Sequence, residues 1–244
     1  MKKNRFILFI CTIAAALMLT SCDVGVITDA LDIAVGEYRQ IGAGTEYSSL
    51  SADSFPDYSG EDRIIINGNE PYFADDEYVP YSFEYYSDLD YLGRCGAAYA
   101  NLGSDLMPQR SRGNISAVKP SGWRSVRYDF VEGKSLYNRS HLIGWQLAGE
   151  DANEKNLITG TRHLNATLML PFENMVADYI KETDCHVLYR VTPFFKGDNL
   201  VCKGVLMEAR SVEDDGDGIC YNVFLYNVQP GVEIDYATGK SRAK

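Results

Sequence analysis

The sequence predicts a mixed α+β protein organised around a twisted antiparallel sheet. Three β-rich runs, 186–195, 200–209 and 220–228, are separated by spacers rich in Gly, Asp and Asn, which favours three antiparallel strands in a meander. Before them, apolar residues recur at helical spacing between Phe172 and Lys181, and Pro171 suits the first turn of a helix. Of the 244 residues, 45% are hydrophobic and 23% charged, which fits a globular domain and excludes a collagen-like, coiled-coil or wholly disordered chain.

The N-terminus has the parts of a signal peptide. Lys2, Lys3 and Arg5 form a basic start without acidic residues, and an apolar stretch follows over 6–19. A membrane-anchor helix is the alternative, but the stretch is short and ends in small polar residues. We therefore expect residues 1–21 to be a signal peptide.

The sequence around Cys22 carries a second signal. Leu19-Thr20-Ser21-Cys22 resembles the bacterial lipoprotein signal, in which the cysteine becomes the lipid-modified first residue of the mature chain. The resemblance implies a protein of the cell envelope outside the cytoplasm, held at a membrane only by a lipid on Cys22. Beyond the N-terminus no run of about 18 apolar residues occurs, so no other segment is expected to span a membrane.

Acidic charge is concentrated before residue 91. The net charge of the chain is −11, and residues 23–90 carry sixteen acidic side chains against only Arg39 and Arg63. Because residues 22–61 are also rich in Gly and Ser and lack clear periodicity, we expect an acidic flexible tether there. A single domain is expected to follow over 62–244.

Shorter elements are expected in the first half of this domain. Residues 64–66 have the pattern of a strand that runs into a turn at Asn67-Gly68. The alanine-rich run 96–102 is expected to be a small helix, and alternating apolar residues over 126–130 predict a strand. An apolar stretch follows at 142–147.

Four cysteines remain once those of the signal peptide and the lipidation site are set aside: Cys95, Cys185, Cys202 and Cys220. Their spacings contain no Cys-x-x-Cys, which disfavours a zinc site. A location outside the cytoplasm permits disulfides, for which three pairings exist. Four free buried thiols are the alternative.

A basic stretch lies in the middle of the chain. Residues 110–139 contain seven Lys and Arg side chains against Asp129 and Glu132. This local excess of positive charge suits the phosphate backbone of a nucleic acid. The alternative is an ordinary solvated surface with scattered bases.

The chain contains only three histidines, and one of them lies in a distinctive setting. His186 begins an alternating strand and is expected to be structural, and His163 has no evident partner. His141 lies in the block 137–143; Asn165 follows 24 residues later, and Glu173 eight residues after that. A lone histidine is more often structural than catalytic, so the combination is what points to chemistry.

These residues resemble the DNA/RNA non-specific endonuclease family, the ββα-metal nucleases whose signature is Asp-Arg-Gly-His. The likeness is closest to secreted bacterial DNases and DNA-entry nucleases and covers roughly 64–240, including the blocks 120–123, 156–165 and 227–231. It implies a ββα-metal fold for 62–244. It also implies a metal-dependent, sequence-non-specific hydrolysis of phosphodiester bonds in DNA, with RNA as a second candidate substrate. No protein partner is implied.

The resemblance, together with the chemistry of each side chain, assigns roles. His141 is expected to be the general base, because a neutral imidazole can take a proton from water near pH 7. The amide oxygen of Asn165 is expected to bind Mg²⁺, with Mn²⁺ as a substitute ion. Arg139 is expected to contact the phosphate and Glu173 to hold metal-bound waters, both as catalytic residues. Further substrate contacts are expected from three basic residues: Arg162, Arg127 and Lys134.

Two positions depart from the family signature. Asn138 stands where the family has Asp, and Ser140 where it has Gly. Asn can still hydrogen-bond but carries no charge. The main alternative is therefore a catalytically weakened relative that acts as a nucleic-acid-binding surface lipoprotein. The remaining alternative is a generic envelope lipoprotein whose likeness to the nuclease family is accidental.

Overall fold

The computed structural model describes residues 40–41 and 46–244. The expected signal peptide, the lipidation site at Cys22 and the first part of the expected tether lie outside these residues. No helix in the described part of the chain is both long and apolar enough to cross a membrane.

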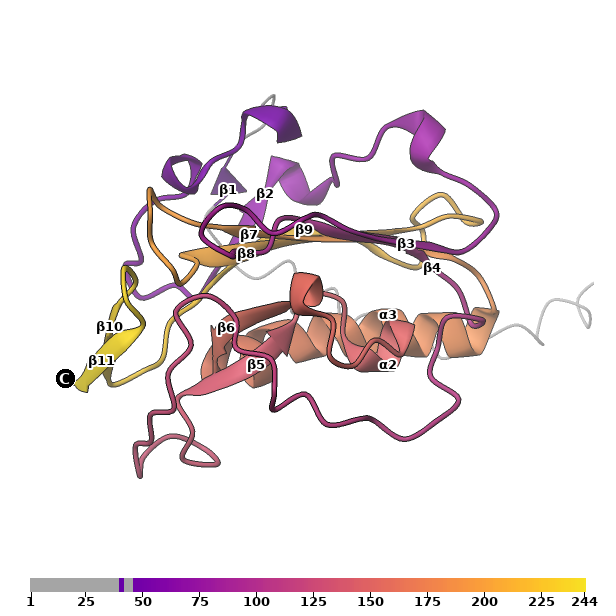
Figure 1. Ribbon diagram of the computed structural model, residues 1–244. Coiled ribbons are helices and arrows are strands. Elements are labelled where there is room, and N and C mark those ends of the chain that lie inside the picture. The colour runs from indigo at the N-terminus through magenta and orange to yellow at the C-terminus, as the bar shows by residue number, and fades with distance from the viewer. Residues whose placement is uncertain (1–39, 42–45) are drawn as a thin grey trace, which may run out of the picture. The chain divides into compact units, whose positions relative to one another are not determined.

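A seven-stranded sheet forms the centre of the domain, in the order β1-β2-β9-β8-β7-β4-β3 (Figure 1). All neighbouring strands are antiparallel except β1 and β2. The strands are β1 (Gln40–Ile41), β2 (Arg63–Ile66), β3 (Phe83–Tyr86), β4 (Ala98–Leu102), β7 (Val187–Phe194), β8 (Gly204–Ser211) and β9 (Cys220–Tyr226). The sequence-based expectation of a mixed fold with a large antiparallel sheet is confirmed.

The predicted meander is formed by β7, β8 and β9. Tyr189 pairs with Ala209, and Ala209 pairs with Tyr221, so the three lie side by side on one face of the sheet. All three are buried, because both faces of these central strands are covered. The predicted strand at 64–66 is also present, as β2, and it turns at Asn67-Gly68.

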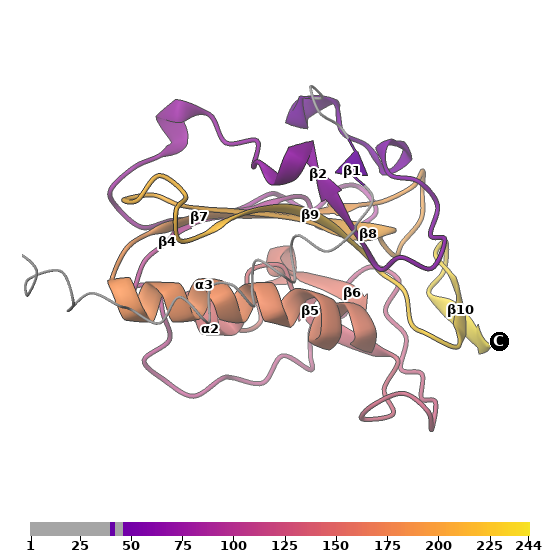
Figure 2. The same cartoon turned by 180° about the vertical axis from the view of Figure 1, so that it is seen from behind.

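The predicted helix is α3 (Leu170–Thr183), which has Pro171 in its first turn. It lies along one face of the sheet, with the hairpin of β5 (Tyr137–His141) and β6 (Leu157–Thr161) beside it (Figures 1 and 2). A π-helical stretch, Leu164–Met169, leads directly from the hairpin into α3. The order β5, β6, α3 gives the ββα arrangement that the resemblance implies. Two further elements complete this side and the C-terminus: α2 (Trp145–Ala148) and the hairpin of β10 (Val232–Asp235) with β11 (Lys240–Ala243).

Two buried asparagines attach the β5–β6 hairpin to its surroundings. Asn227 donates to the carbonyls of Thr159 and Cys202 at 3.0 and 3.2 Å and accepts the Thr161 amide at 2.9 Å, which fixes β6 to the end of β9. Asn156 accepts the Ile143 amide at 2.9 Å and donates to the Ile143 carbonyl at 3.0 Å, just after β5 ends. Both asparagine side chains are fully buried, so these bonds do not compete with water.

The opposite face of the sheet is covered by the segments 46–62 and 67–82 on either side of β2, which the figures show above the strands (Figures 1 and 2). Short 3₁₀ turns run through this part of the chain and before β6: Tyr47–Ser49, Ala52–Ser54, Asn67–Asn69, Asp75–Glu77 and Glu154–Asn156. Phe55 is 2% exposed and stacks on Phe224 with ring centres 3.8 Å apart. We expected residues 46–61 to belong to a flexible tether; instead this stretch is packed, because Ala52 and Phe55 are buried in a hydrophobic cluster on this face of the sheet.

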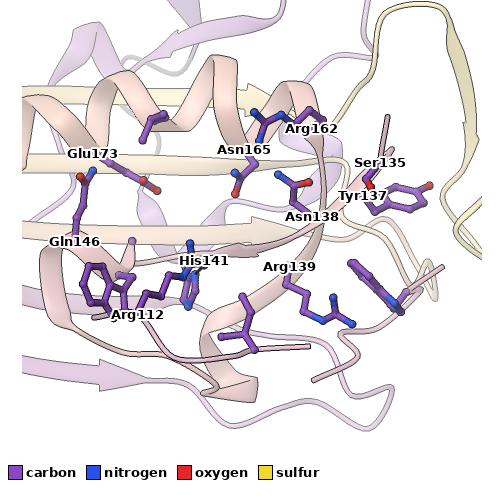
Figure 3. A pocket seen from close by; sticks show the side chains of 15 residues that line it. Arg112, Ser135, Tyr137, Asn138, Arg139, His141, Gln146, Arg162, Asn165 and Glu173 are labelled. Carbon is purple, nitrogen blue, oxygen red and sulfur yellow. Dashed lines mark hydrogen bonds between the residues drawn. The ribbon is translucent and has the colours of Figure 1, made fainter. Parts of the chain in front are cut away.

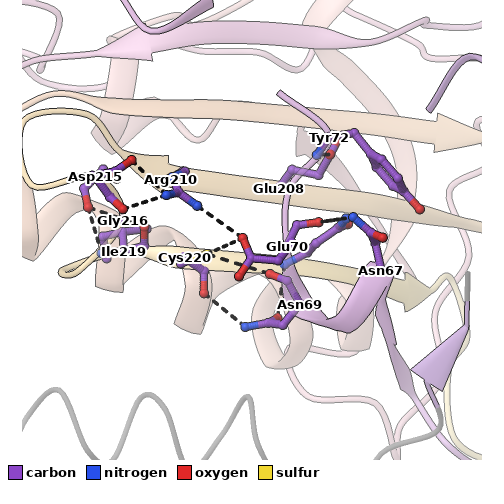
Figure 4. A network of polar contacts seen from close by, with 12 residues as sticks. Asn67, Asn69, Glu70, Tyr72, Glu208, Arg210, Asp215, Gly216, Ile219 and Cys220 are labelled. Atoms are coloured by element: carbon purple, nitrogen blue, oxygen red, sulfur yellow. Dashed lines mark hydrogen bonds and ion pairs between the residues drawn. The ribbon is translucent and has the colours of Figure 1, made fainter. Parts of the chain in front are cut away.

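Polar contacts tie the same segment to β8 and β9 (Figure 4). Glu70 accepts from Arg210 at 3.1 Å, and its backbone carbonyl accepts from Asn222 at 2.7 Å. Asn69 donates to the carbonyl of Cys220 at 3.1 Å. Beneath the segment, the buried Arg190–Glu208 ion pair, 2.8 Å apart, joins β7 to β8.

Two shorter elements differ from the sequence-based expectation. The run 96–102 is not a helix: residues 98–102 form β4, because Ala98, Ala100 and Leu102 alternate onto the buried face between β3 and β7. Residues 126–130 do not form a strand. The chain reverses at Gly133 and Lys134, which both have positive φ, so the pairing is reduced to one bridge between Arg127 and Ser135. The stretch 142–147 turns into α2.

The four cysteines of the domain are free thiols in this structure. Cys95 and Cys202 are buried, and Cys185 and Cys220 are half-buried. Burial raises the pKa of the Cys95 and Cys202 thiols to about 12, which makes both of them unreactive at neutral pH.

Replacement of Phe55 by Ala should show that the folded domain begins before residue 62. Removing this buried ring should lower the free energy of unfolding by about 3–5 kcal/mol, because it leaves a cavity beneath the segment. Urea denaturation measures the change, with Asp53→Ala at an exposed neighbouring site as the control. If Phe55→Ala lost no more free energy of unfolding than Asp53→Ala, the interpretation of this stretch as a flexible tether would stand.

Replacement of Asn227 by Ala should loosen the β5–β6 hairpin. The Thr161 amide and the Thr159 carbonyl would stay buried without this partner, and each such group costs about 1–3 kcal/mol. Asn222→Ala is the matched control, because Asn222 is equally buried on β9 but bonds to Glu70 instead of to the hairpin.

Both variants should unfold at lower urea concentration than the native chain. Hydrogen exchange at the β5 and β6 amides should increase only in Asn227→Ala. Equal exchange at these amides in the two variants would contradict the anchoring role.

Candidate active site

A cavity of about 720 Å³ opens between the β5–β6 hairpin, α2 and the start of α3 (Figure 3). Its lining includes polar side chains from four segments: Arg112 of the loop before β5; Asn138, Arg139 and His141 of β5; Gln146 of α2; and Arg162, Asn165 and Glu173 of the helical segment. The sequence places these residues far apart, and the ββα unit brings them together.

His141 is held at the floor of the cavity in a defined orientation. Its ring is 5% exposed, and its Nε2 lies 2.8 Å from the carbonyl oxygen of Asp151. Because a carbonyl can only accept, Nε2 carries the proton and Nδ1 carries the lone pair. Burial lowers the pKa of His141 below its usual value of 6.5, so the imidazole is neutral at pH 7.

Arg112 contacts the free nitrogen of this ring. Its Nη2 donates to His141 Nδ1 over 3.1 Å, from an exposed loop that connects β4 to β5. Sequence analysis missed Arg112 as a site residue. The only signal was its membership of the basic stretch 110–139, which does not distinguish it from six other cations.

Asn138 and Asn165 present two amide groups to the cavity and point toward each other (Figure 3). Within the described residues, neither side chain makes a hydrogen bond. Unpartnered amides that line a cavity are available to a ligand. Their oxygens are hard donors of the kind that Mg²⁺ and Mn²⁺ prefer.

The π-helical stretch explains why Asn165 and Glu173 line the same cavity. In a regular α-helix, eight residues turn through about 800°, which would leave the two side chains roughly 80° apart. A π-turn accommodates more residues per turn, so it reduces this offset. Asn165 lies inside the π-helical stretch and Glu173 in the first turn of α3, and both face the cavity.

Glu173 lies against Gly144 at the end of the cavity near α2. A Cβ on Gly144 would come within 2.9 Å of Glu173 Oε2, so glycine leaves the room that this carboxylate occupies. Removal from water raises the pKa of Glu173 to about 8, while the charge of Arg112 acts in the opposite direction. A cation in the cavity would favour the ionised form.

The donors present fit a single hard cation. Asn138, Asn165 and Glu173 supply oxygen, and within the described residues no cluster of three His, Cys, Asp or Glu side chains offers a softer or more strongly charged site. An ion held mainly by neutral amides would keep much of its water and could bind substrate phosphate directly.

Arg139 is engaged in holding the loop before it. Its Nε donates to the carbonyl of Val118, its Nη2 donates to that of Ser116 at 2.7 Å, and its guanidinium stacks on Trp123 at 4.0 Å. The expected two-pronged contact with a phosphate would require these bonds to be exchanged. In this structure Arg139 therefore orders the cavity wall.

The three basic residues expected to contact substrate do not all lie at the cavity. Arg162 lines the cavity, with Glu132 3.4 Å from its Nη2. Arg127 and Lys134 lie outside the cavity lining, on the exposed turn before β5, and Lys134 pairs with Asp129 at 2.9 Å. Only Arg162 of the three is placed to meet a phosphate in the cavity.

The other two histidines pair with carboxylates away from the cavity. His163 Nε2 lies 2.8 Å from Asp62, and His186 Nδ1 lies 2.5 Å from Glu213. Neither lines the cavity. Of the three histidines, only His141 is placed for chemistry there.

Ser140, the second departure from the signature, is accommodated by the facing strand. Its side chain is fully buried, and a Cβ on Gly160 of β6 would lie 2.1 Å from its hydroxyl oxygen. Glycine at position 160 of β6 therefore leaves the space that the Ser140 side chain of β5 occupies.

The chain is similar to known nucleases in sequence and in fold. A deoxyribonuclease from Streptococcus dysgalactiae subsp. equisimilis is 25% identical over 248 residues, which cover 84% of this chain and 73% of that protein. The structure of NucA from Streptococcus agalactiae with no metal bound matches with a TM-score of 0.65 at 25% identity, over 80% of this chain and 92% of that chain.

Two further structures share the fold. NucA with a magnesium ion bound matches with a TM-score of 0.66 at 23% identity, over 89% of this chain and 96% of that chain. Sda1 nuclease with a bound zinc ion matches with a TM-score of 0.57 at 27% identity, over 70% and 93% of the two chains.

The family model of the DNA/RNA non-specific endonucleases matches residues 73–213. These residues include the cavity-lining side chains from Arg112 to Glu173. Because the match spans more than half of the chain, this protein belongs to the DNA/RNA non-specific endonuclease family.

Proposed function

We propose that this nuclease is a Mg²⁺-dependent endonuclease that cuts DNA without sequence specificity, with RNA as a second substrate. One observation carries the proposal: the lone pair of His141 Nδ1 is directed into a cavity that also presents two unpartnered amides, a carboxylate and guanidinium groups. Phosphodiester hydrolysis needs a base for water, a cation near the phosphate and donors for its oxygens, and this cavity offers all three.

His141 is the general base in this proposal. Its Nε2–H is held by the Asp151 carbonyl, so the ring cannot turn freely and Nδ1 is the nitrogen that takes a proton from water. Burial keeps the pKa of His141 below 6.5, so the base is unprotonated at neutral pH.

Asn165 is the principal metal-binding residue, with Asn138 and Glu173 beside it. When bound, the ion neutralises charge on the phosphate and stabilises the leaving oxygen. Asn165 would hold the ion through its amide oxygen, and Glu173 would orient water molecules around it. The magnesium bound to NucA supports Mg²⁺, and the zinc bound to Sda1 supports tolerance of other divalent ions.

Arg112 and Arg162 are the phosphate-binding side chains. Their guanidinium groups line the cavity and carry charge at every relevant pH. Contacts of this kind recognise the backbone and carry no base sequence, which agrees with a non-specific enzyme. Arg139 supports them by fixing the wall that carries Trp123.

The expected address of the protein belongs to the same proposal. Residues 1–21 are a signal peptide, and a lipid on Cys22 anchors the mature chain outside the cytoplasm; the sequence of the N-terminus supports both. A nuclease at that location would meet DNA from the surroundings instead of the cell's own chromosome. The membrane would touch only the lipid.

Asn138 favours the one competing function, that of a weakened nuclease that binds nucleic acid without cutting it. The uncharged amide would hold a cation less strongly than the Asp of the family signature. Binding without cleavage is the result that would support this function in the assay below.

Purified protein should degrade plasmid DNA in Mg²⁺ and stop when EDTA is added. His141→Ala should lower the rate by about 10²–10⁴-fold, which is the usual contribution of a general base. His186→Ala is the matched control, because its partner Glu213 lies away from the cavity, and it should cleave normally. Cleavage by His141→Ala within about tenfold of the native rate would contradict the assignment.

Asn165→Ala should lose activity by losing metal affinity. The Mg²⁺ concentration for half-maximal cleavage should increase, and high Mg²⁺ should restore part of the rate, because phosphate and water can still hold the ion. Asn174→Ala, an exposed asparagine in the same helix, controls for the loss of an amide. An equal loss at every Mg²⁺ concentration would assign Asn165 to something other than the metal.

A further inference from the structure

Asp151 contacts both His141 and the loop that carries Arg112. Its backbone oxygen accepts from His141 Nε2 at 2.8 Å, and its carboxylate holds the loop that carries Arg112. The Gly113 amide donates to Oδ1 at 2.7 Å, and Arg110 pairs with Oδ2. The carboxylate is only 16% exposed, and nothing in the proposed mechanism uses it.

The loop 110–113 is held at its point of closest approach to Asp151. Arg110 also donates to the carbonyl of Gly149 at 3.0 Å, so the loop is bound on two sides. A Cβ on Gly113 would lie 2.6 Å from Asp151 Oδ2, which leaves room only for glycine. Arg112 lies between the two residues that Asp151 holds, so Asp151 fixes the backbone from which Arg112 reaches the cavity.

The contact of Arg112 with His141 conflicts with catalysis. Nδ1 must accept a proton from water, yet its lone pair accepts the Arg112 Nη2–H over 3.1 Å. A phosphate attracts a guanidinium more strongly than a neutral imidazole does, because the bond is charge-assisted and can be two-pronged. A nucleic acid in the cavity would therefore draw Arg112 off the ring.

We propose that Asp151 is a positioning residue that holds Arg112 over the base nitrogen of His141 until a nucleic-acid phosphate takes the guanidinium. The inference rests on the proposed function of His141 as the base. In the enzyme without substrate, Arg112 then blocks the Nδ1 of His141, and Nδ1 becomes free only when substrate is bound. Arg112 then moves from the ring to the phosphate while the loop 110–113 stays on Asp151.

Nitrogen NMR of the full chain labelled with ¹⁵N-histidine tests this directly, because the chain has only three histidines. In EDTA without DNA, His141 should show a protonated Nε2 and an Nδ1 shifted by an accepted hydrogen bond. A DNA duplex should move Nδ1 toward the value of a free lone pair. His163→Ala and His186→Ala assign the signals.

Asp151→Ala and Gly113→Ala should both show the uncovered Nδ1 signal before DNA is added. Each should lower kcat/KM by about 10²-fold, because Arg112 is no longer held at the cavity before DNA binds. Asp151→Asn should recover part of both properties, since it keeps an acceptor for Gly113. Asp90→Ala is the matched control: Asp90 holds the amides of Leu92 and Arg94 and the Arg94 side chain in the same way, and it does not line the cavity. It should change neither property.

An unchanged Nδ1 signal in folded Asp151→Ala and Gly113→Ala would overturn the proposal. So would a native signal that does not respond to DNA. The NMR measurement needs no turnover, so it separates the two ideas: native protein that fails to cut DNA in Mg²⁺ contradicts the proposed function, whereas the spectra still decide the role of Asp151.

Discussion

The attachment of the β5–β6 hairpin to the main sheet is the constraint on which the cavity depends. His141 ends β5, and Asn165 follows β6 by one turn of helix, so the hairpin carries both sides of the site. Asn227 fixes the end of β6, and Asn156 fixes the chain just beyond β5. Because both asparagines are fully buried, the hairpin cannot shift without breaking these hydrogen bonds. The distance across the site is thus set by the core of the domain.

Burial shifts the pKa values of two cavity residues, His141 and Glu173, in opposite directions. Partial removal from water disfavours charge, so it lowers the pKa of His141 and raises that of Glu173 to about 8. For His141 the result is a neutral base over the physiological range. For Glu173 the result is a carboxyl group whose ionised form needs a positive charge nearby. A cation beside Asn138 and Asn165 would supply that charge. In the proposed mechanism, a neutral His141 would therefore stand beside a carboxyl group that a bound cation would ionise.

The sequence allowed prediction of those features that local patterns encode. Alternation and turn residues located the β7–β9 meander, and helical spacing located α3. The family resemblance of the block around His141 suggested Asn165 and Glu173 as site residues, and both line the cavity with His141. The Ala-rich run that forms β4 was misassigned, because strand pairing on both sides outweighs the helical preference of alanine. Arg112 and Asn227 could not be found, because their roles arise from contacts with residues far away in the chain.

Anomalous X-ray scattering from crystals soaked in Mn²⁺ is the most direct test of whether the cavity binds a divalent ion. We predict one manganese peak inside the cavity, at the amide oxygen of Asn165 and on the side that faces His141. The peak should weaken or vanish in crystals of Asn165→Ala grown under the same conditions. Manganese bound elsewhere on the domain, with none in the cavity at saturating concentration, would contradict it.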